Sequence, residues 1–136
     1  MRLKNLLPAL LLLAALTACS LLGSPDPLEG TSWALQSYRG APPIPGRAIT
    51  AVFKDGRVGG SSGCNSYGGS YQVKGEKISI GEIGMTEMAC MDPVGVMDQE
   101  QAYLQSLGSA QTFELSNGQL VIYVSDHEAL TFVPQE

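Results

Sequence analysis

The sequence has little positive charge, one histidine and no hydrophobic run long enough to cross a membrane. Eight Lys and Arg residues stand against 13 Asp and Glu residues, so the net charge is −5 at pH 7. This acidic balance argues against binding to nucleic acids and to anionic lipid headgroups. A membrane-spanning helix needs roughly 20 apolar residues, and the longest apolar stretch, from Leu6 to Ala15, is about half that length. We therefore expect no nucleic-acid partner and no transmembrane anchor.

The first 19 residues instead predict a lipoprotein signal. Arg2 and Lys4 precede the apolar stretch, and small residues follow it, an order typical of a cleavable signal peptide. Leu16-Thr17-Ala18-Cys19 resembles the lipobox of bacterial lipoproteins, which implies removal of residues 1–18 and acylation of Cys19. An ordinary secretory signal with a cysteine at its boundary is the alternative. Because two or more acyl chains make a lasting anchor, we expect the N-terminal lipid to hold the mature protein at a membrane.

Cleavage would leave about 118 residues with a net charge of about −7, since Arg2 and Lys4 are lost and every acid remains. A chain of this size forms one domain around a single core. Residues 19–27 contain two prolines, a glycine and two serines, a composition suited to a short tether. The folded domain is therefore predicted at residues 28–136, as a monomer.

Short apolar or alternating segments separated by turn residues predict an antiparallel sheet in this domain. Asp55-Gly56 and Asn117-Gly118 each lie between two such segments and are typical of tight hairpin turns. Residues 40–46 contain three prolines, which cannot donate backbone hydrogen bonds, so this segment is predicted to be a loop. The predicted strands are Trp33 to Tyr38, Ile49 to Phe53, Arg57 to Ser61, Ser70 to Val73, Lys77 to Ile83, Thr112 to Leu115, Gln119 to Ser125 and Ala129 to Val133.

One segment has a helical pattern. Asp92-Pro93 offers an N-cap followed by a proline at the first helical position, and Gly108 lies just past the predicted end at Leu107. The fold class is therefore α+β and mostly β: a curved antiparallel sheet or partial barrel of about eight strands with one α-helix packed on it. The apolar residues on one face of the predicted helix are Val94, Met97, Leu104 and Leu107.

Three motifs, in this order, resemble the META domain (HslJ-like) family. Leu28 to Trp33 opens the domain, Gly63 to Tyr71 lies in its middle, and Thr86 to Cys90 precedes the helix. The resemblance implies a small, mostly β domain of a kind found in envelope lipoproteins and secreted proteins, some of them linked to stress response. It implies no enzyme activity, because the family has no agreed catalytic residues. The motif residues are Trp33, Gly63, Cys64, Asn65, Tyr67, Gly69, Tyr71, Thr86, Met88, Ala89 and Cys90.

Cys64 and Cys90 are the two cysteines that remain if Cys19 carries lipid. Disulfides persist in exported proteins, so we expect a structural disulfide between them. Two buried free thiols that act as small core residues are an alternative. A redox or metal-binding role for the two cysteines is a third alternative, but the lack of a Cys-x-x-Cys motif disfavours it.

Met85, Met88 and Met91 stand three residues apart beside Cys90. Thioether sulfurs are soft ligands that select Cu(I), so a copper site is one hypothesis. Methionines more often fill irregular gaps in a core, especially where a sheet meets a helix. We therefore expect core packing here, with no metal and no cofactor.

The remaining candidates do not form a catalytic grouping. His127, the single histidine, has no partners for a triad or a zinc site and is predicted at an exposed loop tip. No serine lies in a Gly-x-Ser-x-Gly elbow. Five acidic residues show no spacing that selects a glycosidase pair, so they are predicted on the solvated surface. These are Glu76, Glu82, Glu87, Asp98 and Glu100.

The glycine-rich stretch from residue 59 to residue 69 does not fit the phosphate-binding P-loop, because it contains no lysine and no helix follows it. We interpret it as a bend where the sheet curves and backbones approach closely. Its glycines are Gly59, Gly60, Gly63, Gly68 and Gly69.

These features together predict a non-enzymatic, lipid-anchored cell-envelope protein. It would support envelope integrity or the stress response by binding an envelope protein or wall component that the sequence does not name. The alternative is a surface inhibitor or binding module against a protease or cell-wall hydrolase, and an enzyme with an unfamiliar site is a third hypothesis. Ser20 follows Cys19 where many inner-membrane lipoproteins have aspartate, which favours the periplasmic face of the outer membrane in a two-membrane host. In a one-membrane host the outer face of the cell membrane is expected.

Overall fold

The strands form one antiparallel sheet that closes into a barrel, in a computed structural model that describes residues 23–125 and 127–136. Cys19 and the predicted signal lie outside the described residues. Within those residues, no helix is both long and apolar enough to span a membrane. The elements are β1 (Thr31–Tyr38), β2 (Thr50–Lys54), β3 (Arg57–Ser61), β4 (Ser66–Lys74), β5 (Lys77–Ile80), β6 (Gly84–Met85), α1 (Val96–Gly108), β7 (Thr112–Ser116), β8 (Gln119–Ser125) and β9 (Glu128–Pro134).

The order around the barrel is β3-β2-β1-β9-β8-β7-β5-β4, and pairing of β3 with β4 completes the ring. The short strand β6 adds to β4 beside the ring. The predicted fold class is confirmed, since the domain is mostly β with one helix packed on the sheet. Pairing between β3 and β4 makes the barrel closed rather than partial, which the sequence pattern left open.

Alternation along the strands sends every second side chain into the barrel core. In β8, for example, Leu120, Ile122 and Val124 are buried while the residues between them are more exposed. The helix contributes Tyr103, which is fully buried and packs edge-on against Phe132 with ring centroids 6.5 Å apart. One hydrophobic core therefore joins the sheet and the helix.

Both predicted hairpin turns are confirmed. Asp55 and Gly56 have φ angles of 53° and 70°, and Asn117 and Gly118 have φ angles of 52° and 73°. Two consecutive residues with positive φ make the type I′ geometry, whose twist matches that of the flanking strands. These two turns fix the registers of the β2–β3 and β7–β8 pairs.

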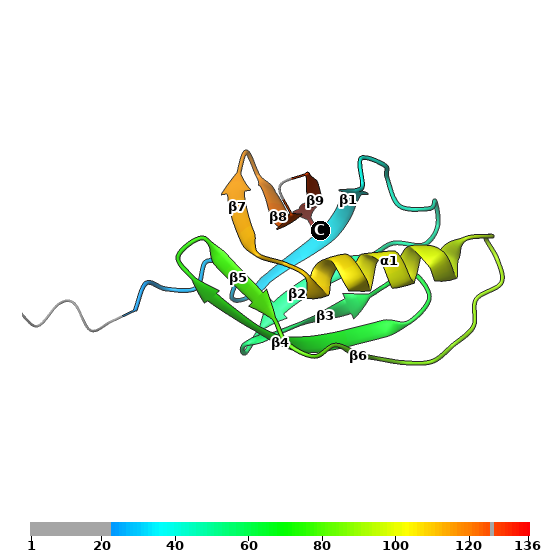
Figure 1. Cartoon of the computed structure of the whole chain (residues 1–136), viewed down its shortest axis with the longest axis horizontal. Coiled ribbons are helices and arrows are strands. Elements are labelled where there is room, and N and C mark those ends of the chain that lie inside the picture. The colour runs from blue at the N-terminus through cyan, green and yellow to red at the C-terminus, as the bar shows by residue number, and fades with distance from the viewer. Residues whose placement is uncertain (1–22, 126) are drawn as a thin grey trace, which may run out of the picture.

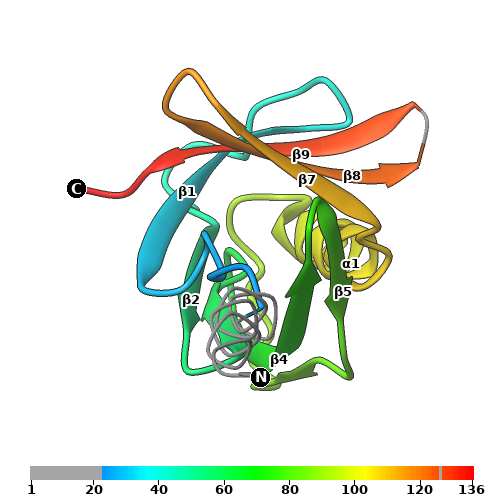
Figure 2. The ribbon, with the colours of Figure 1, turned by 90° about the vertical axis from the view of Figure 1, so that its left-hand side faces the viewer.

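The helix covers the weakest seam of the barrel. Strands β5 and β7 are joined at one pair of residues, Lys77 and Thr112, whereas the other ring pairs extend over three residues or more. Helix α1 contacts both β5 and β8, and Figures 1 and 2 show it running along the barrel beside them. Helix α1 therefore shields the barrel core from solvent where β5 and β7 are paired over the shortest length.

The predicted start of the helix is wrong. The helix begins at Val96 instead of Pro93, because Gly95 has a φ angle of 90° and breaks the helical backbone there. Asp92 and Pro93 therefore precede the helix, with a cis peptide bond between them. Val94, which was assigned to the buried face, is almost fully exposed.

The buried face of the helix is also more polar than predicted. Leu107 is fully buried, as expected, but Met97 and Leu104 are only partly buried. Polar side chains take their places: Gln99 and Glu100 hydrogen-bond to loops of the barrel, and Ser106 bonds to Glu128 of β9. The buried residues of α1 are Val96, Gln99, Glu100, Tyr103, Ser106 and Leu107.

Most predicted strands match the observed ones to within two residues at each end, and two differ by more. The strand predicted from residue 70 begins at Ser66, so the motif residues Tyr67 and Gly69 lie within β4. The strand predicted from Lys77 to Ile83 ends at Ile80, and a separate short strand, β6, follows. Glycine-rich segments lack the β-branched pattern that sequence-based assignment relies on, which is why β4 was predicted too short.

Close approach of backbones, as predicted, explains Gly59, Gly60 and Gly69 of the glycine-rich stretch, but not Gly63 and Gly68. A Cβ atom on Gly59 would lie 2.8 Å from the carbonyl oxygen of Tyr67. One on Gly60 would lie 2.5 Å from the carbonyl oxygen of Thr50. No side chain fits at these distances, so strands β2, β3 and β4 approach one another closely only with glycine at these positions.

Candidate functional site

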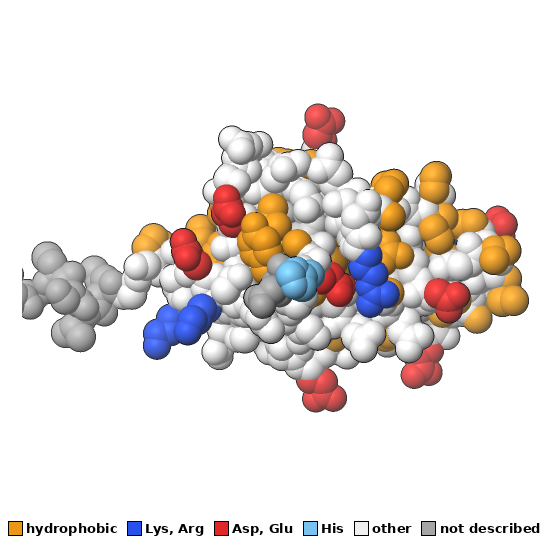
Figure 3. All heavy atoms as spheres, turned by 45° about the horizontal axis from the view of Figure 1, so that its top comes forward, with side chains coloured by type: hydrophobic (Ala, Val, Ile, Leu, Met, Phe, Trp, Pro, Cys, Tyr) orange, Lys and Arg blue, Asp and Glu red, His pale blue; other side chains and the backbone are white. Residues whose placement is uncertain are grey.

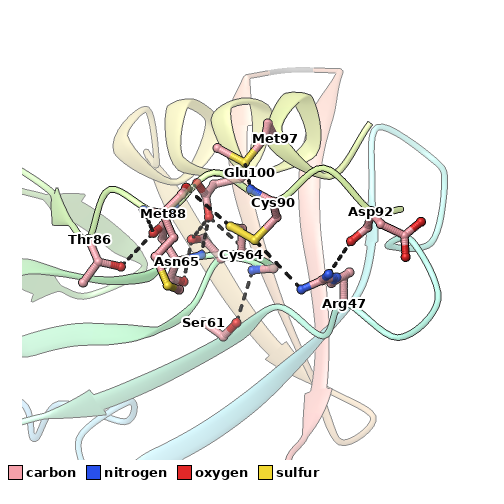
Figure 4. The surroundings of a disulfide bond; sticks show 12 residues. Arg47, Ser61, Cys64, Asn65, Thr86, Met88, Cys90, Asp92, Met97 and Glu100 are labelled. Atoms are coloured by element: carbon pink, nitrogen blue, oxygen red, sulfur yellow. Dashed lines mark hydrogen bonds between the residues drawn. A yellow bond between two sulfur atoms is a disulfide. The ribbon is translucent and has the colours of Figure 1, made fainter. Parts of the chain in front are cut away.

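A disulfide joins the loop between β3 and β4 to the segment that precedes α1. Cys64 and Cys90 are bonded, with their Cα atoms 5.9 Å apart. The structure thus contains the disulfide that the sequence analysis expected, rather than two free thiols. Figure 4 shows that the bond lies beside the start of α1, with the side chains of Asn65 and Glu100 next to it. The disulfide ties residues 86–95, which contain little regular structure, to the barrel.

Asn65 holds the same segment by a second set of bonds. Its side-chain oxygen accepts hydrogen bonds from the backbone N–H of Met88 (2.7 Å) and the hydroxyl of Thr86 (2.8 Å). Its side-chain nitrogen donates to the carbonyl oxygen of Met88 (3.0 Å) and to Oε1 of Glu100 (2.7 Å). Asn65 is 2% exposed, so these four bonds satisfy an amide that is shielded from water.

Glu100 is a buried carboxylate held by donors from the β3–β4 loop. It is 1% exposed, and Oε2 accepts from the Ser62 hydroxyl (2.6 Å) and the backbone N–H groups of Asn65 (2.7 Å) and Cys64 (3.3 Å). Burial alone would raise the pKa of Glu100, but the hydrogen bonds from Ser62, Asn65 and Cys64 outweigh burial and lower the pKa below its ordinary value. The carboxylate is therefore ionised at neutral pH.

Glu100 was predicted on the solvated surface, and that prediction is wrong. The other four acidic residues of that group are exposed, as predicted. A signal for Glu100 exists in the sequence: it lies four residues after Val96, and Tyr103 and Leu107 continue the same face. The error arose because all five acidic residues were placed on the surface for lack of a paired spacing, without weighing the position of Glu100 on the helix.

Two more contacts tie neighbouring loops to this cluster. The side-chain oxygen of Gln99 accepts a hydrogen bond from the backbone N–H of Ile44 (2.6 Å), which fixes the proline-rich loop against α1. The Arg47 guanidinium donates to the carbonyl oxygen of Asp92 and lies 4.0 Å from the sulfur of Cys90. Figure 4 shows Arg47 and Asp92 on the same side of the disulfide. The cluster therefore connects three loops and one helix.

The tyrosines of the central motif belong to the core. Tyr67 donates to the carbonyl oxygen of Thr50 (2.8 Å), so Tyr103, whose oxygen lies 2.7 Å away, donates to Tyr67. Burial raises the pKa of both Tyr67 and Tyr103 far above the ordinary value, so both stay protonated. Tyr71 packs edge-on against Phe53 with ring centroids 4.9 Å apart. These motif residues contribute to packing, and the Tyr67 hydroxyl is engaged by Thr50 and Tyr103.

The methionines before α1 are on the surface, and the prediction that they fill the core is wrong. Met85, Met88 and Met91 are 43%, 57% and 84% exposed, and Val94 is 93% exposed. We call these four residues the methionine strip. Segment 86–95 lies outside the ring of strands, so its side chains are free to face outward while its backbone bonds to Asn65. Figure 3 shows hydrophobic side chains gathered toward the end of the molecule where this segment lies.

A groove of about 570 Å³ lies between α1 and β6, next to the methionine strip. Apolar side chains from both elements line it, with one exposed acidic residue, Asp98, from α1. Met97 also accepts a hydrogen bond at its sulfur from the backbone N–H of Cys90 (3.4 Å), which orients its side chain. The lining residues are Met85, Met97, Asp98, Glu100, Gln101, Leu104 and Gln105.

The other candidates from the sequence lie elsewhere. His127 is exposed in the turn before β9, as predicted. Nearby, Glu128 accepts hydrogen bonds from Ser106 (2.7 Å) and from Arg39 (3.3 Å). The bond from Ser106 is the main cause that lowers the pKa of Glu128, and Arg39 adds to it against a smaller effect of burial. Among residues 23–125 and 127–136, no three His, Cys, Asp or Glu side chains are grouped so that they could hold a metal ion.

Fold and site together define a class of protein: a small closed antiparallel β-barrel with one helix, in which a disulfide and a buried carboxylate fix the segment before the helix. The chain belongs to the META domain family, whose pattern matches residues 26–136. The resemblance found in the three sequence motifs is thus confirmed. A comparison with curated proteins finds no match.

Solved structures with the same fold include three proteins. An NMR structure of a protein from Burkholderia xenovorans is 30% identical, with a TM-score of 0.67 over 85% of this chain and 94% of that one. A second protein solved by NMR is 20% identical, with a TM-score of 0.66 over 83% of this chain and 96% of that one. A crystal structure of a DUF4847 family protein from Bacteroides vulgatus is 14% identical, with a TM-score of 0.57 over 80% of this chain and 96% of that one. The last two show similarity of fold alone.

Proposed function

We propose that this META domain protein is a lipid-anchored, non-enzymatic component of the bacterial cell envelope that acts by binding another envelope component. The observation that carries the binding role is the methionine strip. Four large apolar side chains are exposed between residues 85 and 94, and exposed apolar side chains gathered on a folded domain favour an interaction site. Here the strip lies beside an apolar groove, so the two together offer a larger surface than either alone.

The polar cluster around the disulfide supports a structural role for the family motifs. Asn65 and Glu100 are almost completely buried, and each uses its side chain to bind neighbouring backbone or side-chain groups. A catalytic acid or base must reach the group from which it takes or to which it gives a proton. Neither of these residues presents a free polar atom to a substrate, so the motifs serve to hold the methionine strip in place.

The anchor in this proposal is the acylated Cys19, with the protein on the periplasmic face of the outer membrane in a two-membrane host. The lipobox and Ser20 support this placement. Intact mass spectrometry of protein extracted from membranes tests it directly. A chain that starts at Cys19 and carries two or three acyl groups is expected. A chain without acyl groups would contradict the anchor.

Deletion of the gene tests the proposed role in envelope integrity or stress response. The deletion strain should become more sensitive to detergent and to osmotic shock, and the wild-type gene should restore resistance. A Cys19→Ala variant, which cannot be acylated, should restore it less well because the protein is no longer held at the membrane. Unchanged sensitivity of the deletion strain under all these stresses would contradict the role.

A second candidate function is inhibition of a protease or cell-wall hydrolase at the cell surface. The specific observation in its favour is the segment with Met91 and Val94, which is highly exposed and yet fixed at Cys90 by the disulfide. Such preorganised loops bind enzyme clefts at low entropic cost. Titration of the purified protein into lysozyme and a panel of proteases tests this function. Full enzyme activity at about 100 μM protein would rule out useful affinity for those enzymes.

A further inference from the structure

Charge is distributed very unevenly along the chain. Residues 78–136 contain nine Asp and Glu residues and no Lys or Arg. The segment from Arg39 to Lys77 contains six Lys and Arg residues against two acids. The methionine strip and all the residues that line the adjacent groove belong to the part without cations. Any ligand that binds there meets apolar side chains and the exposed Asp98, with no Lys or Arg among the lining residues.

We propose that the groove between α1 and β6, together with the methionine strip, binds a basic amphipathic segment of a partner protein, one with Lys or Arg flanking large apolar side chains. This proposal rests on the proposed binding function and names the surface and the chemistry of the partner. It commits to a protein segment because the groove extends along α1 from Met97 to Gln105, roughly 12 Å. That length matches about two turns of a bound helix.

Apolar complementarity comes from thioether side chains. Met85 and Met97 line the groove, and Met88 and Met91 extend the apolar surface beyond it. Unbranched, polarisable thioethers adapt to partner side chains of different shapes, so methionine-lined surfaces suit the binding of amphipathic segments. The backbone beneath them is fixed by the Cys64–Cys90 bond and by Asn65. The partner therefore meets a preorganised backbone with adaptable side chains, which keeps the entropic cost of binding low.

Charge complementarity favours a cationic partner. Asp98 is exposed within the groove, and Glu87 and Asp92 are exposed on either side of Cys90. Arg47 contacts the segment before α1, but its guanidinium is already engaged by the carbonyl oxygen of Asp92. An acidic rim around an apolar groove steers basic segments toward it and repels acidic ones.

Binding of designed peptides tests the proposal. The full-length protein would be reconstituted in nanodiscs of zwitterionic lipid, with empty nanodiscs as background. The probe is a fluorescent Leu/Lys amphipathic helix of about 18 residues, or five turns. One control peptide has Glu in place of Lys, and another has Ser in place of Leu. We expect the Leu/Lys peptide to bind with a Kd of about 10 μM, and both control peptides to bind at least about tenfold more weakly.

Two pairs of matched variants locate the site. Met85 in the groove and Leu115 on β7 are 43% and 41% exposed, so Met85→Ser and Leu115→Ser remove similar exposed apolar surface. Asp98→Lys and Glu114→Lys make the same charge change, at the groove and on β7. We expect Met85→Ser to weaken peptide binding about fivefold and Asp98→Lys about tenfold. The two β7 variants should change binding less than twofold. All four variants should stay folded at the temperature of the assay, with a small drop in thermal midpoint for Asp98→Lys, because Asp98 lies in the first turn of α1.

Several results would overturn the proposal. The first is that the Leu/Lys peptide, at about 100 μM, binds the protein no more strongly than it binds empty nanodiscs. The second is that either control peptide binds as strongly as the Leu/Lys peptide. The third is that the β7 variants weaken binding as much as the groove variants. A photo-reactive residue in place of Gln101 tests other occupants. Crosslinks from it to a second copy, or to residues 19–22 of the same mature chain, would show that the chain itself fills the groove. If the peptide fails to bind while the deletion strain remains stress-sensitive, this proposal fails and the envelope function stands.

Discussion

At the scale of single residues, the strongest determinant of the site is the pairing of an amide with a buried carboxylate. Asn65 both accepts from and donates to Met88, and its remaining N–H points at Glu100. Aspartate has almost the same shape as asparagine but no N–H to donate. The site therefore depends on the side-chain nitrogen of Asn65, which the substitution Asn65→Asp replaces with an oxygen that cannot donate.

We predict that Asn65→Asp destabilises the fold by about 3 kcal/mol or more at pH 7. The new carboxylate would lie 2.7 Å from Oε1 of Glu100, where two negative charges repel and no hydrogen bond forms. The loss should be smaller near pH 4, because one of the two carboxyl groups then takes up a proton and donates. Chemical denaturation at both pH values measures this. Ser66→Asp, on the exposed neighbouring side chain, is the control, and an equal loss there would contradict the explanation.

A second prediction concerns backbone approach at glycine. Gly60→Ala should destabilise the fold by about 1–3 kcal/mol, as over-packing does elsewhere, because its Cβ would lie 2.5 Å from the carbonyl oxygen of Thr50. Gly84→Ala, in β6, meets no atom within 4 Å and should change stability by less than about 0.5 kcal/mol. Thermal unfolding of the two variants gives the comparison. Similar midpoints for both would mean that β2 and β3 separate more easily than the structure suggests.

At the scale of elements, segment 86–95 is held by attachments to its neighbours rather than by secondary structure, and two of them fix its first half and its middle. One is the disulfide at Cys90, and the other is the set of bonds from Asn65 to residues 86 and 88. Segments with few apolar contacts and few backbone bonds are usually the first to open. The disulfide limits that opening by holding the segment at its middle.

We predict that replacing both Cys64 and Cys90 by serine lowers the free energy of unfolding by about 3.5 kcal/mol, from the entropy of closing a loop of this length. The backbone N–H of Met88 should also exchange with solvent faster, since only Asn65 then holds it. Denaturant unfolding and hydrogen exchange give the two readouts. If the Met88 amide stays as protected as in the wild type, Asn65 alone fixes the segment and the disulfide contributes elsewhere.

The elements also show why parts of the sequence analysis failed. The hairpins at Asp55-Gly56 and Asn117-Gly118 were predictable, because two adjacent residues that tolerate positive φ leave few alternatives. The helix start was not, because Asp92-Pro93 fits the usual N-terminal pattern equally well. Gly95 interrupts that pattern, because its φ angle of 90° is one that glycine adopts without steric cost and that ends the helical backbone there.

At the scale of the whole molecule, the acidic groups make stability depend on pH. The folded-state pKa values of Glu100 and Glu128 lie below the ordinary value for glutamate, which is about 4.3. Groups of this kind add stability that is complete above the unfolded pKa and is lost as the pH falls through the folded pKa. Both groups act in the same direction, so acid weakens the attachment of α1 to the loops around it.

We therefore predict that the thermal midpoint is nearly constant from pH 7 to about pH 5 and falls progressively below about pH 4.5. Glu100→Gln should be less stable than the wild type by about 2–4 kcal/mol at pH 7, because its amide hydrogens face donors where the carboxylate accepted hydrogen bonds. The difference should shrink at lower pH as the wild type protonates. Differential scanning calorimetry across this range measures both effects. A difference that does not change with pH would show that Glu100 is not ionised in the folded protein.

The sequence by itself determined the family, the mostly β class, the two tight hairpins and the exposure of His127, because local rules and distinctive motifs specify each of these. Tertiary structure decided the closure of the barrel by β3 and β4, the burial of Glu100 and the exposure of the methionine strip. Each of these depends on contacts between segments far apart in the chain. Glu100 is buried because the β3–β4 loop supplies hydrogen-bond donors to its carboxylate. The methionines are exposed because Cys64 and Asn65, which lie twenty or more residues away in the sequence, hold the backbone beneath them.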